Sequence, residues 1–211
     1  MLVAEWMTRS VVSVGPNEKI SQAATIMGHR RIRQIPVVEE DKLVGLVTKS
    51  DLLRACPPDL NPFSLVGPIA QELARPIRHI MTASPVVVAP DAPLEGAAHL
   101  LIDKRVNALP VVSGTRLAGI ITGSDISRAL LAALGAGAPG VRITFEVGDD
   151  EDVFTFVTNL AKRHGVRVVS VTAFAHDKQR TAVVRLDQEK QPMVEEIWKT
   201  GHLVSSVARF T

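Results

Sequence analysis

The hydrophobic pattern of the first part of the chain switches between two periods. A short β-branched run at 11–14 is followed by a stretch of helical spacing, and then by apolar runs at 35–38 and 43–48 around a polar turn. A period near 3.6 predicts a helix, and β-branched runs between turn residues predict strands. With Asn17 as a helix cap and a second helix from Ser50, the predicted order is strand, helix, strand, strand, helix. The apolar positions of the first helix are Ile20, Ala23, Ala24 and Met27.

The same pattern recurs 74 residues further along the chain. Met7–Ala55 aligns with Met81–Ala129 without a gap, and about 19 of the 49 aligned positions are identical. Asp91 takes the place of the first helix cap, and the sequence Gly-x-x-Thr-x-Ser-Asp occurs at both 45–51 and 119–125. Two copies are too few for a solenoid, which needs about three or more. The repeat therefore predicts two units that pack on each other.

The last third of the chain breaks the repeat and has its own order of elements. Strands are predicted at 141–147, 166–175, 181–186 and 203–209, and helices at 153–164 and 192–200. The acidic residues at 149–152 offer a helix cap, and Gly165 is a natural helix end. The order βαββαβ is that of ferredoxin-like domains. The predicted fold class of the chain is therefore α/β, of the α+β kind.

Proline-rich and glycine-rich stretches separate these parts. A Pro-rich loop begins at 56, a partly helical stretch interrupted by Pro68 and Pro76 follows it, and the sequence GAGAPG at 135–140 predicts a flexible linker. The predicted domains are a first repeat with a linker helix at 1–75, a second repeat at 76–134, the linker at 135–140 and a third domain at 141–211.

Charge and composition argue against several classes of function. The formal net charge is +2, and the basic cluster at 29–33 keeps nucleic-acid binding as an alternative. No aromatic platform or helix-turn-helix spacing lies beside this cluster, which argues against nucleic acid as a partner. The longest uncharged stretch, at 129–141, is about 13 residues, whereas a membrane span needs about 20. No signal peptide is visible at the N-terminus, so we expect a cytoplasmic protein with no membrane partner.

No motif predicts catalysis. The only cysteine, Cys56, cannot form an intrachain disulfide. The chain has no nucleophile-elbow, zinc-protease or P-loop sequence, and the glycine-rich linker lacks the Lys-Ser/Thr that a P-loop requires. We therefore expect a protein without enzyme activity.

The repeated motif has a structural and a functional interpretation, and the residues alone leave both open. In the structural one, Ser before Asp caps a helix and the acid favours its N-terminus. In the functional one, Thr48 or Thr122 at a strand end and the first N–H groups of the next helix bind a phosphate oxygen. Asp51 or Asp125, one helical step further on, would accept hydrogen bonds from a ribose diol.

Met-Thr-x-Ser, the helix, the IPVV or LPVV strand and the Gly-x-x-Thr-x-Ser-Asp motif together resemble a CBS domain, and residues 7–129 resemble a tandem pair, or Bateman module. The resemblance implies a regulatory protein that senses adenosine-containing ligands: AMP, ADP, ATP or S-adenosylmethionine, with or without Mg²⁺, and no required cofactor. The ligand-binding residues that it implies are Thr8, Ser10, Arg31, Arg33, Gln34, Pro36, Thr48, Ser50 and Asp51 in the first copy, and Thr82, Ser84, Arg105, Asn107, Ala108, Pro110, Thr122, Ser124 and Asp125 in the second.

The two copies differ in charge before the IPVV and LPVV strands. The first has Arg31 and Arg33 where the second has Arg105 and Asn107. A basic run at this place can simply be a solvated helix end that relieves the helix dipole. If a nucleotide binds, the first site is expected to favour more phosphate charge, so we expect unequal sites.

Behind a CBS pair, a βαββαβ segment resembles an ACT domain, and this architecture resembles the acetoin-utilisation proteins of bacteria. The resemblance implies a homodimer and a target protein that the chain regulates. ACT domains that bind amino acids generally have Gly where the first strand meets the helix, but here that turn holds the four acids at 149–152. These acids would repel a carboxylate ligand, which favours a dimerising role over amino-acid binding.

Overall fold

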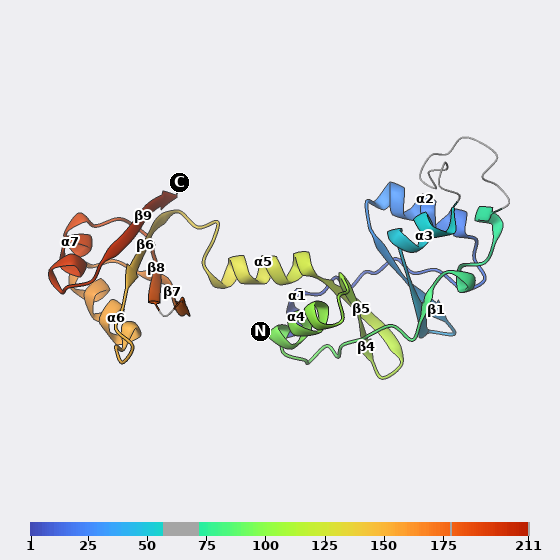
Figure 1. Ribbon diagram of the computed structural model, residues 1–211, viewed down its shortest axis with the longest axis horizontal. Helices are drawn as coiled ribbons and strands as arrows, with labels where there is room; N and C mark the ends of the chain where they lie inside the picture. Colours follow the sequence, from blue (N-terminus) through green and yellow to red (C-terminus); the bar gives the residue numbers. More distant parts are fainter. Residues whose placement is uncertain (57–71, 178, 211) are drawn as a thin grey trace. The chain divides into compact units, whose positions relative to one another are not determined.

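The computed structural model describes residues 1–56, 72–177 and 179–210 and divides the chain into two compact units, Met1–Ile126 and Ser127–Thr211 (Figure 1). The predicted linker helix of the first repeat falls largely on residues outside the described ones, as does Pro68.

The first unit contains both copies of the repeat. Its first half comprises α1 (Val3–Trp6), α2 (Ile20–Arg30), β1 (Gln34–Glu39), β2 (Lys42–Thr48) and α3 (Lys49–Ala55). The second half comprises the short 3-10 helices η1 (Glu72–Ala74) and η2 (Ile77–His79), then β3 (Thr82–Ala83), α4 (Leu94–Asp103), β4 (Ala108–Ser113), β5 (Arg116–Thr122) and the first residues of α5 (Gly123–Ala133). The predicted helix, two strands and closing helix of each copy are confirmed.

The strands of both copies join in one sheet of order β1-β2-β5-β4, with β3 paired to β2. The hairpins β1–β2 and β4–β5 are antiparallel (Figure 1). Both have a register shift at the same place, between Val37 and Val38 and between Val111 and Val112. The opening strand predicted at 11–14 and its counterpart in the second copy are reduced to single bridges, at Val14 and at Val88. Those bridges are nevertheless equivalent in the two copies, because the same hydrophobic pattern was used twice.

Each copy sends its opening Met-Thr segment to a strand of the other copy. Ala83 of β3 pairs with Gly45 of β2, and Thr8 bridges Ile120 of β5. This crossing explains the glycine of the repeated motif. A Cβ atom at Gly45 would lie 2.5 Å from Sδ of Met81 and 3.2 Å from the carbonyl oxygen of Thr82, so glycine makes room for this approach.

Tertiary contacts place the helix starts later than the sequence predicts. Neither Asn17 nor Asp91 is the N-cap: α2 begins after Lys19, and α4 begins after Pro93. The amide of Ile20 donates to the carbonyl of Arg75, so contacts with residues distant in sequence fix where the first helix begins. The prediction of the caps was wrong for this reason.

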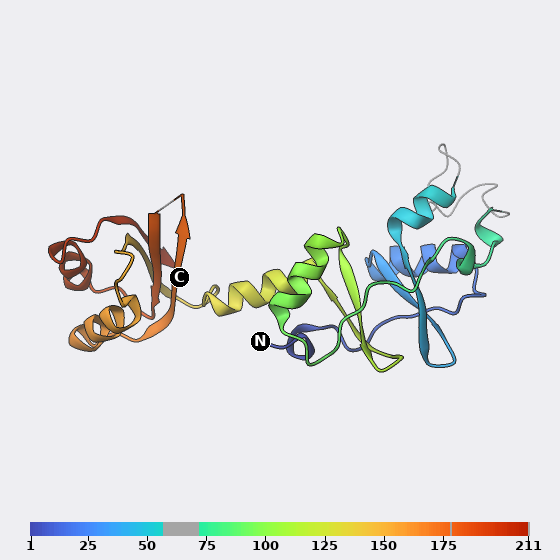
Figure 2. The ribbon, with the colours of Figure 1, turned by 60° about the horizontal axis from the view of Figure 1, so that its bottom comes forward.

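The second unit begins within α5 and consists mainly of β6 (Gly140–Glu146), α6 (Val153–His164), β7 (Val168–His176), β8 (Gln179–Leu186), α7 (Gln191–Lys199) and β9 (Val204–Phe210). The antiparallel sheet has the order β7-β8-β6-β9, and both helices lie on one of its faces (Figure 2). The predicted order βαββαβ is confirmed. Asp152 caps α6 by accepting from the amide of Thr155, and Gly165 ends the helix at φ 64°.

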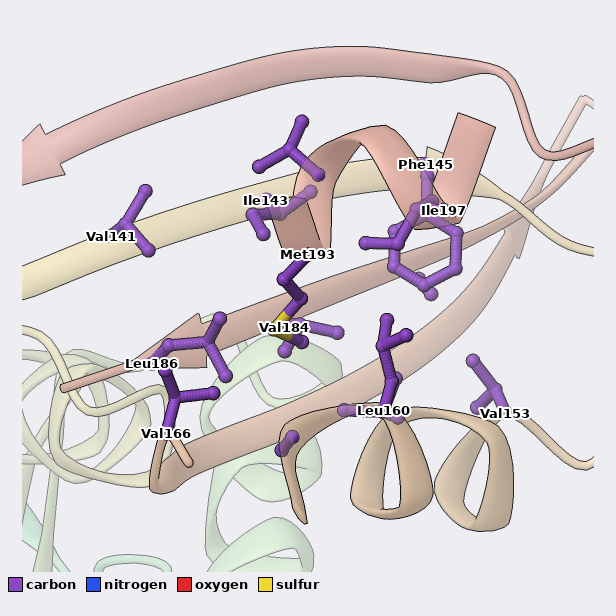
Figure 3. Close-up of a cluster of buried hydrophobic side chains, with 14 of the residues drawn as sticks. Val141, Ile143, Phe145, Val153, Leu160, Val166, Val184, Leu186, Met193 and Ile197 are labelled. Carbon is purple, nitrogen blue, oxygen red and sulfur yellow. The ribbon is translucent and has the colours of Figure 1, made fainter. Parts of the chain in front are cut away.

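The core of the second unit lies between this sheet and its helices. Figure 3 shows Leu160 of α6 and Met193 of α7 pointing toward the strand that carries Val184. Phe145 and Ile143 of β6 are fully buried in the same cluster. The alternation of inward and outward residues along β6 and β8 therefore serves one apolar face, as the sequence pattern predicted.

The glycine-rich segment before β6 contacts the opposite face of this sheet. The hydroxyl of Ser170 donates to the carbonyl of Leu134 at 2.9 Å, and Arg185 donates to the carbonyl of Ala138. The guanidinium of Arg185, which is only 4% exposed, also lies 4.3 Å from the centroid of the Phe210 ring. Part of the segment predicted as a flexible linker is thus attached to the second unit.

Candidate ligand-binding site

The first unit contains a cavity of about 660 Å³ that residues of both copies line. Of the predicted site residues, it brings together Arg33, Gln34, Thr48, Ser50, Asp51, Thr82, Ser84, Arg105, Asn107 and Ala108. The pairing of β3 with β2 is what places the opening segment of the second copy beside the motif of the first. The cavity is therefore a product of the crossed topology and not of one repeat.

Other predicted residues do not line this cavity: Thr8, Ser10, Arg31, Pro36, Pro110, Thr122, Ser124 and Asp125. Pro36 and Pro110 are buried within β1 and β4, where their carbonyls accept from the amides of Val14 and Val88. Arg31 is the residue that ends α2, in a left-handed conformation, and it is exposed.

Sequence reasoning missed two cations of the cavity, Lys49 and Arg54. Lys49 occupies the variable position of the repeated motif, and Gly123 is its counterpart in the second copy. Arg54 lies three residues after Asp51, and this helical spacing is the signal that could have found it. The apolar lining residues include Leu46, Leu53 and Val106.

At the centre of the motif, Thr48 and Asp51 bond to each other reciprocally. Oδ2 of Asp51 accepts from the amide of Thr48 at 2.8 Å and from its hydroxyl at 2.7 Å, and Oγ1 of Thr48 accepts from the amide of Asp51. This is a capping box at the start of α3. The cap is Thr48 and not Ser50, which corrects the structural interpretation of the motif in detail.

The remaining carboxylate oxygen of Asp51, Oδ1, pairs with the guanidinium of Arg54. Asp51 is 6% exposed, whereas the Arg54 side chain is 75% exposed. The pair therefore joins a fixed, buried acceptor to a cation that stands largely in solvent.

Two of the donors that were predicted to hold a phosphate have partners inside the protein. The Thr48 hydroxyl donates to Asp51, and the amide of Lys49 donates to the carbonyl of Arg33 at 2.8 Å. An anion in the cavity would instead meet the side-chain cations Arg33, Lys49, Arg54 and Arg105. To donate to a phosphate, the Thr48 hydroxyl would have to release Asp51, so a direct contact between Thr48 and phosphate stays a prediction.

The second motif repeats the two bonds that Thr48 donates to Asp51. Oδ2 of Asp125 accepts from the amide of Thr122 at 2.8 Å and from its hydroxyl at 2.7 Å. Asp125 is 3% exposed, and the bridge between Thr8 and Ile120 brings the opening segment of the first copy to this strand. The two motifs are thus locally equivalent.

The crossed topology changes the expected distribution of charge. The prediction of unequal sites assumed that Arg31 and Arg33 belong to the site of the first motif. Arg33 lines the cavity with Asp51, but Arg31 does not, and Arg105 of the second copy does. The cationic character of the cavity therefore comes from both copies.

Two further properties concern the described ranges 1–56, 72–177 and 179–210. Within them, His, Cys, Asp and Glu side chains form no group of three or more that could hold a metal ion. No helix there combines the length and apolarity needed to cross a membrane.

The two tandem α/β repeats share one sheet and together line one cavity. A model of the CBS domain family matches residues 3–57 and 77–132. The chain belongs to the CBS domain family, and the predicted tandem pair is confirmed. Proteins of this family are typically regulatory, and enzymes that carry CBS domains use them as regulators. The match ends before residues 141–211, whose ACT-like assignment stays a prediction.

The curated relatives include proteins of very different length. The CBS domain-containing protein YhcV of Bacillus subtilis is 29% identical over 145 residues, which are 68% of this chain and 96% of that protein. The match covers only 33% of the uncharacterized protein MJ1404 of Methanocaldococcus jannaschii and 23% of the homoserine O-acetyltransferase of Methanohalobium evestigatum. The chain thus spans a third or less of the length of these two relatives.

Solved structures resemble the paired repeats. The CBS pair of MJ0100, in complex with 5′-methylthioadenosine and S-adenosyl-L-methionine, is 28% identical with a TM-score of 0.52, over 63% of this chain and 97% of that one. CBSX2 in complex with AMP is 30% identical with a TM-score of 0.53, over 62% and 96%. AcuB of Vibrio cholerae, a candidate acetoin utilization protein, is 28% identical with a TM-score of 0.55, over 64% and 93%.

Proposed function

We propose that this protein senses an adenosine-containing ligand in the cavity beside Asp51 and has a regulatory role. The observation that carries the proposal is a buried carboxylate in a cavity of about 660 Å³ that also holds four cationic side chains. A ribose diol suits the carboxylate, and phosphate oxygens suit the cations. The adenosine compounds bound by MJ0100 and CBSX2 support the same ligand class.

The charge of the cavity favours phosphate-bearing ligands over S-adenosylmethionine. Arg33, Lys49, Arg54 and Arg105 face a single acid, Asp51, among the lining residues. Charge-assisted bonds between guanidinium and phosphate are stronger than neutral ones, whereas the sulfonium of S-adenosylmethionine adds a further positive charge. We therefore propose AMP, ADP or ATP as the ligand of this cavity, with no role assigned to Mg²⁺.

The second motif supports a second site. Thr122 and Asp125 repeat the bonds of Thr48 and Asp51, but the position of Lys49 is Gly123. A site there would have one cation fewer from its motif. We therefore propose two unequal sites, and the presence of Lys49 in the first motif alone is a further reason for the inequality.

The regulatory step would follow from differential binding. A cavity lined by both copies holds a ligand best in one relative arrangement of its walls, so binding shifts the population toward that arrangement. We propose that a homodimer and a target protein receive this change, with residues 141–211 serving dimerisation as an ACT-like domain. The acids at 149–152 still argue against amino-acid binding there.

A thermal-shift screen with adenosine, AMP, ADP, ATP and S-adenosylmethionine tests the proposed function. A ligand at a hundred times its Kd stabilises the protein by about 2.7 kcal/mol, which for a unit of the size of Met1–Ile126 corresponds to a Tm increase of about 10 °C. We expect the nucleotides to raise the Tm of the first unit, and Asp51→Asn to reduce the shift. This variant keeps one oxygen for Thr48, so the cap survives while the charge is removed.

The internal bonds of the motif favour one competing account, in which Thr48 and Asp51 serve only as a helix cap. In that case no adenosine compound moves the Tm at millimolar concentration, and Asp51→Asn changes stability alone. Asp125→Asn is the matched control for the second motif. Equal phosphate-chain preference in both Asn variants would contradict the unequal sites.

A further inference from the structure

The two carboxylate oxygens of Asp51 differ in what they still offer to a ligand. Oδ2 already accepts two hydrogen bonds from Thr48, both between groups at the start of α3. Oδ1 accepts from the guanidinium of Arg54. A carboxylate has about four lone-pair positions, so a ribose diol must bind mainly through Oδ1. Arg54 therefore stands at the oxygen that the ligand needs.

Arg54 is able to leave this oxygen. Its side chain is 75% exposed, and the pair joins residues three apart on one helix. Exposed pairs of this kind change an equilibrium by about fivefold at most. The bonds between Thr48 and Asp51 define the helix start, so the weak partner of the carboxylate is Arg54 and not Thr48.

The same guanidinium also lines the cavity in which a phosphate would lie. Arg33, Lys49 and Arg105 line it as well, and Asp51 is the only acid among the lining residues. If a neutral nucleoside displaces Arg54 from Asp51, the guanidinium loses its carboxylate partner while other cations lie nearby, which is unfavourable. A nucleotide that displaces it supplies a new anion, because its phosphate accepts a charge-assisted bond.

We infer that Arg54 is a specificity-determining residue, which occupies Oδ1 of Asp51 in the ligand-free protein and moves to the phosphate of a bound nucleotide. In this role Arg54 disfavours adenosine itself and favours its phosphates. The inference rests on the proposed function, since it needs adenosine ligands to bind beside Asp51. The inference goes beyond the proposed function because it assigns the discrimination between nucleoside and nucleotide to Arg54, which exchanges Asp51 for the phosphate.

Opposite effects on two ligands test this role. Kd values for adenosine and ATP are measured by isothermal titration calorimetry for the full chain and for Arg54→Met, which keeps a long apolar stem. We expect Arg54→Met to bind adenosine about two- to fivefold more tightly, because the competitor for Oδ1 is gone. We expect it to bind ATP about tenfold more weakly, because one guanidinium–phosphate bond is lost.

Arg30→Met is the matched control, since Arg30 is an exposed arginine at the end of α2 that does not line the cavity. It should leave both Kd values within about twofold. The same measurements in an Asp125→Asn background restrict binding to the motif of Asp51. Arg54→Lys, which keeps the charge, should retain most of the preference for ATP.

The outcomes separate the inference from the proposed function. If the unmodified protein binds the ligands but Arg54→Met weakens both equally, or leaves their ratio unchanged, the role of Arg54 is overturned and the proposed function stands. If the unmodified protein binds neither adenosine nor ATP, the proposed function fails and the role of Arg54 fails with it.

Discussion

The glycine of each repeated motif is fixed by the other copy of the repeat. A Cβ atom at Gly119 would lie 2.6 Å from Sδ of Met7 and 2.9 Å from the carbonyl oxygen of Thr8. The thioether could shift, but the backbone oxygen belongs to the bridge between Thr8 and Ile120 and cannot move without breaking it. The crossing of the two copies therefore depends on the absence of a Cβ atom at this position.

Gly119→Ala should destabilise the first unit by about 1–3 kcal/mol, the usual cost of overpacking. Gly28→Ala is the matched control: Gly28 lies within α2, and nothing is within 4 Å of the added Cβ. That substitution should stabilise by about 0.5–1 kcal/mol, because alanine favours a helix interior. Urea denaturation of both variants measures the difference. Equal effects of the two changes would contradict the steric account.

The two helices of the second unit are joined by charged groups as well as by the core. Glu196 of α7 accepts from His164 at 2.6 Å and from Arg163 at 2.5 Å, both at the end of α6. The hydrogen bond from His164 and then that from Arg163 lower the pKa of Glu196 below its ordinary value of 4.5. The basic end of one helix thus pairs with an acid of the other, in agreement with the helix dipole.

This pairing predicts a pH dependence at the level of the two elements. Because the pKa of Glu196 is lower in the folded than in the unfolded state, its contribution is fully present above about pH 4.5 and is lost as pH falls through the folded pKa. Glu196→Gln should therefore be less stable than the unmodified protein at pH 7, and the gap should close toward pH 3. Denaturation midpoints across this range measure it, with the exposed neighbour Glu195→Gln as control. A gap independent of pH would contradict the pairing.

The chain consists of two units with separate cores. The buried cluster of the second unit draws only on residues between Val141 and Ile197. Its sheet is closed on one face by α6 and α7 (Figures 2 and 3). The segment before β6 is attached to the other face through Ser170 and Arg185. A unit of this size with its own core has what independent folding requires.

We therefore expect the fragment 127–211 to fold alone. It should show a cooperative thermal transition and a dispersed amide spectrum, and Phe145→Ala should lower its stability by about 3–5 kcal/mol, because the fully buried ring is replaced by a cavity. Circular dichroism and NMR of the isolated fragment check this. A fragment without a cooperative transition would show that the first unit is needed for the fold.

The order of helices and strands was predictable because it depends on local periodicity. The strands at 35–38 and 109–112, and the helix from 153 to Gly165, follow from apolar spacing and from a capping acid and glycine within the same segment. The caps Asn17 and Asp91 were wrong, because the helix starts bond to residues distant in sequence, such as Arg75 and Met1. The residues that lie near each helix start in the sequence do not indicate these distant partners.

By itself, the sequence determined the repeat, the elements of each copy and the motif that contains Thr48 and Asp51. Only the tertiary structure decided that Thr82, Ser84 and Arg105 lie in the same cavity as that motif. The physical reason is that strand pairing joins segments that are far apart in the chain. The residue pattern of β3 does not indicate that its partner is β2. The structure also decided that Arg54 occupies the carboxylate oxygen on which ligand choice is proposed to depend.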